Sequence, residues 1–157
     1  MTKTRREFIG ESAAVMGAAL GTVCLGGCAT LAGKSAMPMP PASSYRIEET
    51  ELFIDLAKTP DLQGIGGAVK YAFPALGEEH KVIVARTGEN VFVALPDRCS
   101  HGSRELNYLH DEDIFRCSSF GRSRFATDGT VQKGPAKSDL SAFPVARKGQ
   151  ALVVRFA

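Results

Sequence analysis

Two short segments decide the fold of this 157-residue chain: Cys99–Leu106, with the sequence CSHGSREL, and Cys117–Gly121, with the sequence CSSFG. Each follows a short apolar run typical of a β-strand, and each is polar and contains glycine, as loops do. Loops at the ends of adjacent antiparallel strands face each other, so we expect two thiols and one imidazole to converge. Thiolate and imidazole ligands together suit zinc or an iron–sulfur centre.

The sequence around these segments predicts further short strands. Alternating or β-branched runs occupy residues 51–56, 81–86, 90–95, 114–116 and 151–156. Thr87-Gly88-Glu89 separates the second and third runs, which indicates a hairpin. After the first 33 residues, no window of ten or more residues has a sustained helical period of apolar positions. We therefore expect a mostly β domain of antiparallel sheets, arranged as a small sandwich or barrel.

Composition excludes several classes of protein. The formal net charge is +2 and 23% of the residues are charged, so there is no strongly basic field and nucleic acid is not an expected partner. Four cysteines are too few for a small secreted scaffold held together by disulfides. A hydrophobic fraction of 44% excludes a disordered chain.

The first 28 residues have the features of an export signal. Arg5 and Arg6 are followed by an uncharged run from Ser12 to Gly33 that is rich in alanine and glycine. The paired arginines resemble a twin-arginine signal, and Leu25-Gly26-Gly27-Cys28 resembles a bacterial lipobox. Cys28 is then the expected lipidation site and the first residue of the mature protein. The alternative is an uncleaved membrane helix, for which the glycine-rich run is poorly suited.

The remaining chain divides into a linker and one domain. Residues 29–45 are rich in proline, alanine and serine, which predicts a semi-extended tether. Residues 46–157 form the expected domain. Cys24 and Cys28 belong to targeting in this interpretation, which leaves Cys99 and Cys117 as the only cysteines of the mature domain. Either form of the signal predicts an exported protein, anchored to the membrane on its periplasmic or extracytoplasmic side.

The domain resembles the Rieske iron–sulfur family. That family has Cys-x-His in a first loop, Cys-x-x-His in a second and Gly-Pro-Ala in a third. In this chain Cys99-Ser100-His101 matches the first loop, Cys117 opens the second, and Gly134-Pro135-Ala136 matches the third. The resemblance covers about 110 residues, from near Ile47 to the C-terminus. It implies a Rieske-like antiparallel β sandwich with two cluster-binding loops, placed after the signal segment.

The resemblance also implies a [2Fe–2S] cluster, in which one iron takes two cysteines and the other takes two histidines. Carried over by position, the ligands are Cys99, His101 and Cys117. The fourth position holds Phe120, and the second loop is one residue longer than usual before Phe125. Two other histidines are candidate substitutes for the fourth ligand. His110 lies in an acidic turn before Cys117, and the short strand between them should place His110 at the opposite end of that strand from Cys117. His80 precedes a different strand.

Three functions are compatible with this ligand set. The first is iron–sulfur electron transfer to a redox protein, a quinone or a cytochrome, with the chain as an electron-transfer component rather than a stand-alone enzyme. The second is a binding or structural lipoprotein without a cofactor, in which a Cys99–Cys117 disulfide replaces the cluster and Phe120 covers it as an apolar lid. The third is an enzyme with a cysteine nucleophile, which lacks an acidic partner and an oxyanion loop.

Overall fold

The computed structural model describes residues 37–73 and 80–156, which include eleven strands in three antiparallel sheets. The expected class, mostly β with antiparallel sheets and a Rieske-like fold, is confirmed. The predicted signal segment and Cys28 lie outside the described residues. No helix within the described residues is long and apolar enough to span a membrane.

The first sheet joins the two ends of the domain. Its strand order is β1-β2-β11-β10, so the β1–β2 hairpin and the β10–β11 hairpin are joined through β2 and β11. Phe53 of β2 is paired with Val153 of β11, so residues a hundred positions apart in sequence lie side by side. The strands are β1 (Tyr45–Glu48), β2 (Glu51–Asp55), β10 (Val145–Lys148) and β11 (Ala151–Arg155).

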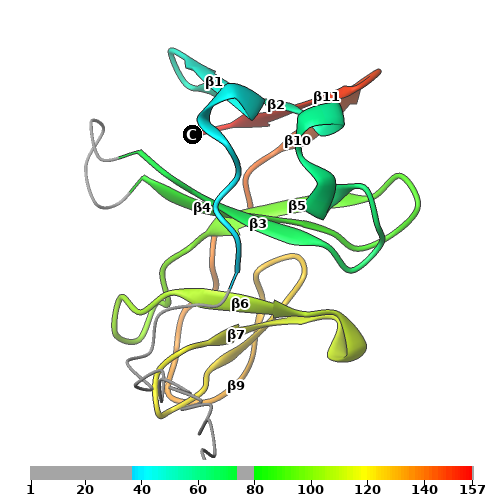
Figure 1. Ribbon diagram of the computed structural model, residues 1–157. Helices are drawn as coiled ribbons and strands as arrows, with labels where there is room; N and C mark the ends of the chain where they lie inside the picture. The colour runs from blue at the N-terminus through cyan, green and yellow to red at the C-terminus, as the bar shows by residue number, and fades with distance from the viewer. Residues whose placement is uncertain (1–36, 74–79, 157) are drawn as a thin grey trace, which may run out of the picture. The chain divides into compact units, whose positions relative to one another are not determined.

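The second sheet lies between the first and the third, as Figure 1 shows. It contains β3 (Ala68–Ala72), β4 (Lys81–Arg86) and β5 (Phe92–Pro96) in that order. Side chains alternate along β4: Val82 and Val84 enter the core shared with the first sheet, and Ile83 and Ala85 enter the core shared with the third. Burial of both faces explains why this strand is apolar at consecutive positions.

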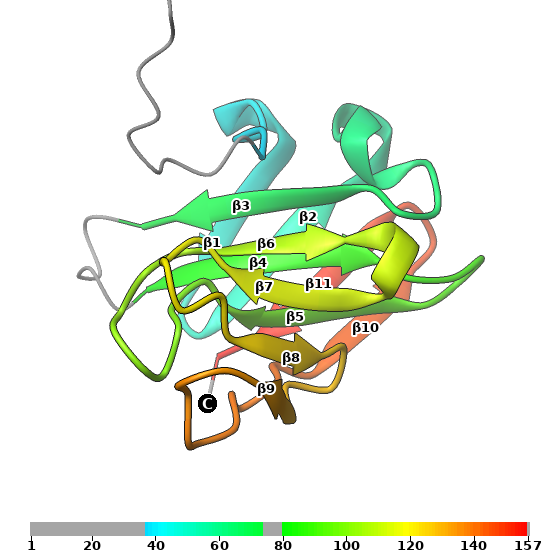
Figure 2. The ribbon, with the colours of Figure 1, turned by 90° about the horizontal axis from the view of Figure 1, so that it is seen from below.

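The third sheet carries the second cysteine. Its strands are β6 (Leu106–Leu109), β7 (Ile114–Cys117), β8 (Arg124–Ala126) and β9 (Val131–Lys133), in sequence order. Figure 2 shows β6, β7, β8 and β9 side by side. The short 3-10 helix η5 (His110–Glu112) connects β6 to β7. Cys117 is paired with Leu106 at the opposite end of this hairpin.

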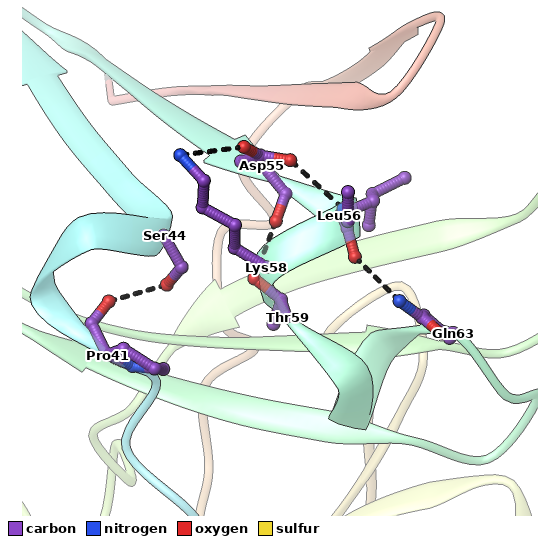
Figure 3. Close-up of polar contacts among 8 residues, drawn as sticks. Pro41, Ser44, Asp55, Leu56, Lys58, Thr59 and Gln63 are labelled. Atoms are coloured by element: carbon purple, nitrogen blue, oxygen red, sulfur yellow. Dashed lines mark hydrogen bonds and ion pairs between the residues drawn. The ribbon is translucent and has the colours of Figure 1, made fainter.

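A compact polar connection leads from β2 toward β3. The 3-10 helices η2 (Leu56–Lys58) and η3 (Pro60–Leu62) follow β2 directly. Asp55 caps η2, because its side chain accepts a hydrogen bond from the backbone of Ala57, and it also forms an ion pair with Lys58 at 3.3 Å (Figure 3). The Thr59 hydroxyl donates to the Asp55 carbonyl at 2.9 Å. The Asp55 side chain thus satisfies one backbone donor at the start of η2, and the two side-chain contacts hold the turn against the end of β2.

The last residues of the predicted tether contact the domain. The backbone N–H of Lys70 on β3 donates to the carbonyl of Pro38 at 3.3 Å. Met37 packs against the core between the second and third sheets. The 3-10 helix η1 (Ala42–Ser44) then leads into β1, with the Ser44 hydroxyl donating to the Pro41 carbonyl at 2.6 Å (Figure 3). The chain therefore enters the domain along the edge of β3.

Candidate metal centre

Backbone hydrogen bonds shape the two cysteine loops and join them. In the first loop, the N–H of Cys99 donates to the carbonyl of Arg104 at 2.7 Å. In the second, the N–H of Cys117 donates to the carbonyl of Ser123 at 2.8 Å. The N–H of Ser118 donates to the carbonyl of Glu105 at 2.9 Å and links the loops directly. Two segments separated by a hairpin are thus held face to face, as the sequence predicted.

The two thiols lie next to each other and are nearly inaccessible to solvent. Cys99 and Cys117 are each 2% exposed, and both are free cysteines. The disulfide expected between them in a protein without a cofactor is therefore not present in this structure. The loops converge as predicted, but not at the ends of adjacent strands of one sheet: β5 and β7 belong to different sheets, and the two thiols meet in the core between them.

Hydrogen bonds surround both sulfur atoms. The thiol of Cys117 donates to the hydroxyl of Ser119 at 3.1 Å, and the N–H of Ser119 donates to the Cys117 Sγ at 3.5 Å. Burial raises the pKa of the Cys99 thiol, and the neighbouring Cys117 thiol adds to this shift. The backbone N–H of His101 and the Ser123 side chain oppose it. These donors favour negative charge on sulfur, which is the form that binds metal.

His101 lies in the first loop, and its imidazole does not form a metal-binding group with the two sulfurs. Its side chain is exposed. Within the described residues, no group of three or more histidine, cysteine, aspartate or glutamate side chains is arranged to hold a metal ion. The structure therefore brings together the two predicted thiol ligands and leaves the predicted imidazole on the surface of the same loop.

Phe120 projects into solvent and does not cover the thiols. The N–H of Arg122 donates to the carbonyl of Ser119 at 3.1 Å, which closes a tight turn with Phe120 and Gly121 at its tip. Arg122 takes a positive φ of 43° to complete the turn. Phe120, at the tip of this turn, reaches a relative exposure of 106%. The prediction that Phe120 covers the two cysteines as an apolar lid was therefore wrong.

A third loop completes the site, and Ser123 connects it to the second. Ser123 is fully buried, and its hydroxyl accepts a hydrogen bond from the N–H of Ala136 at 3.1 Å. Gly134 has a φ of 103°, and a Cβ there would lie 2.6 Å from the Cα of Ser123. Ser100 in the first loop donates to the carbonyl of Ser138 at 2.7 Å. The Gly-Pro-Ala segment therefore packs directly against the second loop, and only glycine at position 134 allows this close approach.

A buried ion pair at the base of the first loop was missed by the sequence analysis. Asp97 is 3% exposed, and its Oδ1 accepts the N–H of Leu106 at 2.7 Å. Its Oδ2 lies 2.9 Å from the Nζ of Lys70, which also lies 3.2 Å from Glu105. Burial raises the pKa of the Asp97 carboxyl, and the Lys70 ammonium partly opposes this. Asp97 joins the end of β5 to the start of β6 and closes the loop that carries Cys99 and His101.

The other two histidines lie in different surroundings. His110 begins η5, at the end of the β6–β7 hairpin away from Cys117, as the sequence predicted. A Cβ at Gly66 would meet the His110 ring at 2.6 Å, so the ring packs against a glycine backbone. His80 precedes β4, and its Nδ1 atom is buried. Neither joins a group of three possible metal ligands within the described residues.

One family model matches this chain. The family model described as the Rieske [2Fe-2S] domain matches residues 56–144. A search of curated proteins gives no match. Similar solved structures include the ferredoxin of carbazole 1,9a-dioxygenase from Nocardioides aromaticivorans IC177, with 19% identity, a TM-score of 0.53 and coverage of 68% of this chain and 98% of that chain.

Two further solved structures are similar. A complex of reduced oxygenase and oxidized ferredoxin in carbazole 1,9a-dioxygenase has 25% identity, a TM-score of 0.54 and coverage of 66% of this chain and 92% of the other. The plasma membrane Rieske protein PetC3 from the cyanobacterium Synechocystis PCC 6803 has 26% identity, a TM-score of 0.49 and coverage of 57% and 87%. The family match spans more than half of the chain and includes all three loops, so this protein belongs to the Rieske [2Fe–2S] domain family.

Proposed function

We propose that this chain is an electron-transfer protein that holds a [2Fe–2S] cluster with Cys99 and Cys117 on one iron and His101 on the other. The observation that carries this proposal is the pair of buried, adjacent thiols on two loops that the family uses for its cluster. A cluster of this kind supplies one-electron chemistry when bound. The protein's own contribution is to position the ligands and to set the polarity around them.

Residue types at the family positions supply three of the four ligands of a Rieske centre, and the structure brings two of them, the thiols, together. The two adjacent thiols fit the iron that takes cysteine ligands. Four hydrogen-bonding groups of Ser119, His101 and Ser123 surround the two sulfur atoms. His101 follows Cys99 by two residues, and its side chain is exposed. Phe120 at the fourth position has no ligating atom.

The chain's polar groups have a defined role toward such a cluster. The N–H of Ser119 and the N–H of His101 stabilise negative charge on the two sulfurs. Burial of both sulfurs excludes water from them, which disfavours additional negative charge and so affects the reduction potential. Asp97 and Ser123 keep the loops in register through hydrogen bonds to Leu106 and Ala136.

A second candidate function is a Rieske-fold binding protein that has lost its cofactor. Phe120 favours it, because an exposed aromatic side chain stands where the family has a ligand. In such a protein the adjacent thiols would be available for oxidation to a disulfide in an exported compartment. The two functions differ in one measurable property, which is the iron content of the protein.

The deciding experiment is anaerobic purification of the full chain, followed by iron and sulfide analysis and electron paramagnetic resonance of the reduced protein. Electron transfer predicts two irons per chain and a spectrum that Cys117→Ala abolishes, since alanine offers no ligand. Ser118→Ala is the matched control, because Ser118 contributes its backbone N–H and the variant retains it. Iron-free protein, or iron retained in Cys117→Ala, would overturn this function.

For its location, we propose export and anchoring at the membrane, with the domain on the periplasmic or extracytoplasmic side. Support comes from the sequence alone: the paired Arg5 and Arg6, the uncharged run and the lipobox-like segment ending at Cys28. A membrane location would place the domain near a quinone, a cytochrome or another redox protein, which are the partner classes we propose for it.

A further inference from the structure

A cavity of about 320 Å³ lies at the far end of β5 from the cysteine loops. Its walls come from η2 and η3, the end of β4, the start of β5 and the β10–β11 hairpin. Cys99 follows the other end of β5, so the length of this strand separates the cavity from the candidate metal centre. Its volume is at the small end of the range for ligand pockets, about 300–1,000 Å³. The cavity therefore has room for a small molecule.

Arg86, at the end of β4, is fixed in the cavity wall by neutral acceptors. Its Nε donates to the carbonyl of Gly88 at 3.2 Å, and its two Nη atoms donate to the carbonyls of Gln63 and Glu89. The guanidinium carbon also lies 5.5 Å from the centre of the Phe92 ring. A guanidinium has five N–H groups, so after these three hydrogen bonds two N–H groups remain for a ligand.

Arg147 of β10 brings a second positive charge to the same cavity. Its Nε donates to the carbonyl of Gly149 at 3.0 Å, and its Nη1 donates to the Oδ1 of Asn90 at 2.6 Å. Asn90 directly follows Glu89, the residue whose carbonyl holds Arg86. Both guanidiniums are therefore anchored to the same turn between β4 and β5.

Neither guanidinium is neutralised by a carboxylate. Within the described residues, no ion pair forms at Arg86 or Arg147, whereas three other arginines each contact a glutamate at 2.6 Å: Arg46, Arg124 and Arg155. Among the described residues that line the cavity, none is acidic. Two fixed positive charges without a counterion favour an anionic ligand.

Hydrogen bonds between the walls hold the cavity open without a ligand. The side-chain amide of Gln63 donates to the carbonyl of Leu56 at 3.2 Å (Figure 3). The N–H of Leu56 donates to the carbonyl of Gln150 at 2.9 Å, which joins η2 to the β10–β11 hairpin. The N–H of Gly66 donates to the carbonyl of Arg86 at 2.8 Å. A site that is already formed in this way spends less binding free energy on ordering its own side chains.

We propose that this cavity binds a small organic carboxylate. The planar fork of a guanidinium matches the two oxygen atoms of a carboxylate. The rest of the wall is partly apolar, since Leu56, Leu62 and Phe92 line it. The carboxylate contacts the two guanidiniums and the apolar part of the ligand packs against these side chains. An apolar wall with a few fixed polar groups is typical of small-molecule sites.

The test is titration of the full chain with sodium benzoate at constant ionic strength, measured by isothermal titration calorimetry. We expect saturable binding of benzoate. Acetate should bind more weakly because it has little apolar surface, and benzamide should bind more weakly because it has a similar shape but no charge. Absence of saturable benzoate binding, or binding of acetate or benzamide as tight as that of benzoate, would overturn the proposal.

Two variants separate a specific contact from general attraction to a basic surface. Arg147→Gln should weaken benzoate binding about tenfold, because it removes one of the two guanidiniums. Lys148→Gln is the matched control: it makes the same change of charge at the next position, where the exposed side chain lines a different hollow with Val153 and Arg155. It should change the affinity less than about twofold. Equal losses in the two variants would contradict the proposal.

Arg147→Lys tests the geometry of the contact. Lysine keeps the positive charge but lacks the planar fork, so this variant should restore only part of the affinity lost in Arg147→Gln. Full affinity in Arg147→Lys would contradict paired hydrogen bonding to a carboxylate. Benzoate binding does not depend on iron, so iron-free protein that binds benzoate contradicts the proposed electron transfer only, and iron-loaded protein that does not bind it contradicts this inference only.

Discussion

Around the site, residues of the same type differ in burial and therefore in their structural role. Two phenylalanines in one short stretch show this. Phe120 is fully exposed at a turn, whereas Phe125 on β8 is fully buried in the core between the second and third sheets. Phe120 and Phe125 are only five positions apart in the sequence. Phe120 is exposed to solvent, whereas Phe125 packs in the core and helps to hold the third sheet in place.

These two residues give the first prediction. Phe125→Ala should lower the free energy of unfolding by about 3–5 kcal/mol, because it removes a fully buried ring and leaves a cavity. Phe120→Ala should change it by less than about 0.5 kcal/mol, as expected for an exposed site. Chemical denaturation of both variants measures the difference. A large loss in Phe120→Ala would mean that its ring packs over the thiols after all.

At the scale of elements, the site lies where β5 ends, β6 begins and β7 ends. Asp97 links the end of β5 to the start of β6 through its hydrogen bond with Leu106, and the pairing of Cys117 with Leu106 links β6 to the end of β7. The salt bridge to Lys70 extends this link to β3 in the central sheet. The cysteine loops are therefore supported by both sheets that enclose the second core.

Asp97 gives the second prediction. Asp97→Ala should destabilise the protein by about 3–5 kcal/mol, because it removes one partner of a buried ion pair and leaves the N–H of Leu106 unsatisfied. Asp97→Asn should cost clearly less, since its amide oxygen can still accept that N–H. Thermal and denaturant unfolding provide the comparison. Equal losses in the two variants would show that charge, and not the hydrogen bond, accounts for the effect.

At the scale of the whole molecule, two apolar cores are built on opposite faces of the central sheet. Tyr71 of β3 lies in the first core, 1% exposed, with its ring stacked on Phe73 and edge-on to Tyr45. Burial raises the pKa of Tyr71 well above its usual value. The core therefore contains an ionisable group that remains neutral when folded.

The third prediction is a loss of stability in alkali. Above about pH 10 the unfolded chain ionises Tyr71 while the folded chain keeps its proton, so the unfolded state is favoured increasingly as pH rises. The free energy of unfolding should fall by up to about 1.4 kcal/mol per pH unit from this residue. Tyr71→Phe should remove that part of the slope in denaturant titrations at several pH values. An unchanged slope would assign the alkaline effect to other groups.

The fourth prediction concerns the proposed membrane anchor. Cys28→Ser should release the domain from the membrane fraction, because acylation at this position is the expected anchor and the glycine-rich run is a poor membrane helix. Arg5→Lys combined with Arg6→Lys should leave unprocessed protein in the cytoplasm. Cell fractionation with immunoblotting measures both. Retention of Cys28→Ser at the membrane would instead support an uncleaved helix.

Local sequence patterns were sufficient for the strands with the clearest runs. Residues 81–86 and 151–156 were predicted as strands, and β4 and β11 occupy nearly the same positions. The small strands β8 and β9 were not predicted, because three residues carry too little periodicity. They become part of a sheet because β8 pairs with the edge of β7 and because the side chain of Phe125 is buried in the core.

For the site, residue types alone were enough to predict the candidate ligands, which are two cysteines and one histidine in the loops, with phenylalanine at position 120 where the family has a fourth ligand. Packing in three dimensions was needed to show that the thiols are adjacent and buried, that Phe120 faces solvent, and that Asp97 and Ser123 hold the loops. The reason is physical. Residue type fixes which atoms can bind metal, whereas burial and turn geometry depend on packing between segments that are distant in sequence.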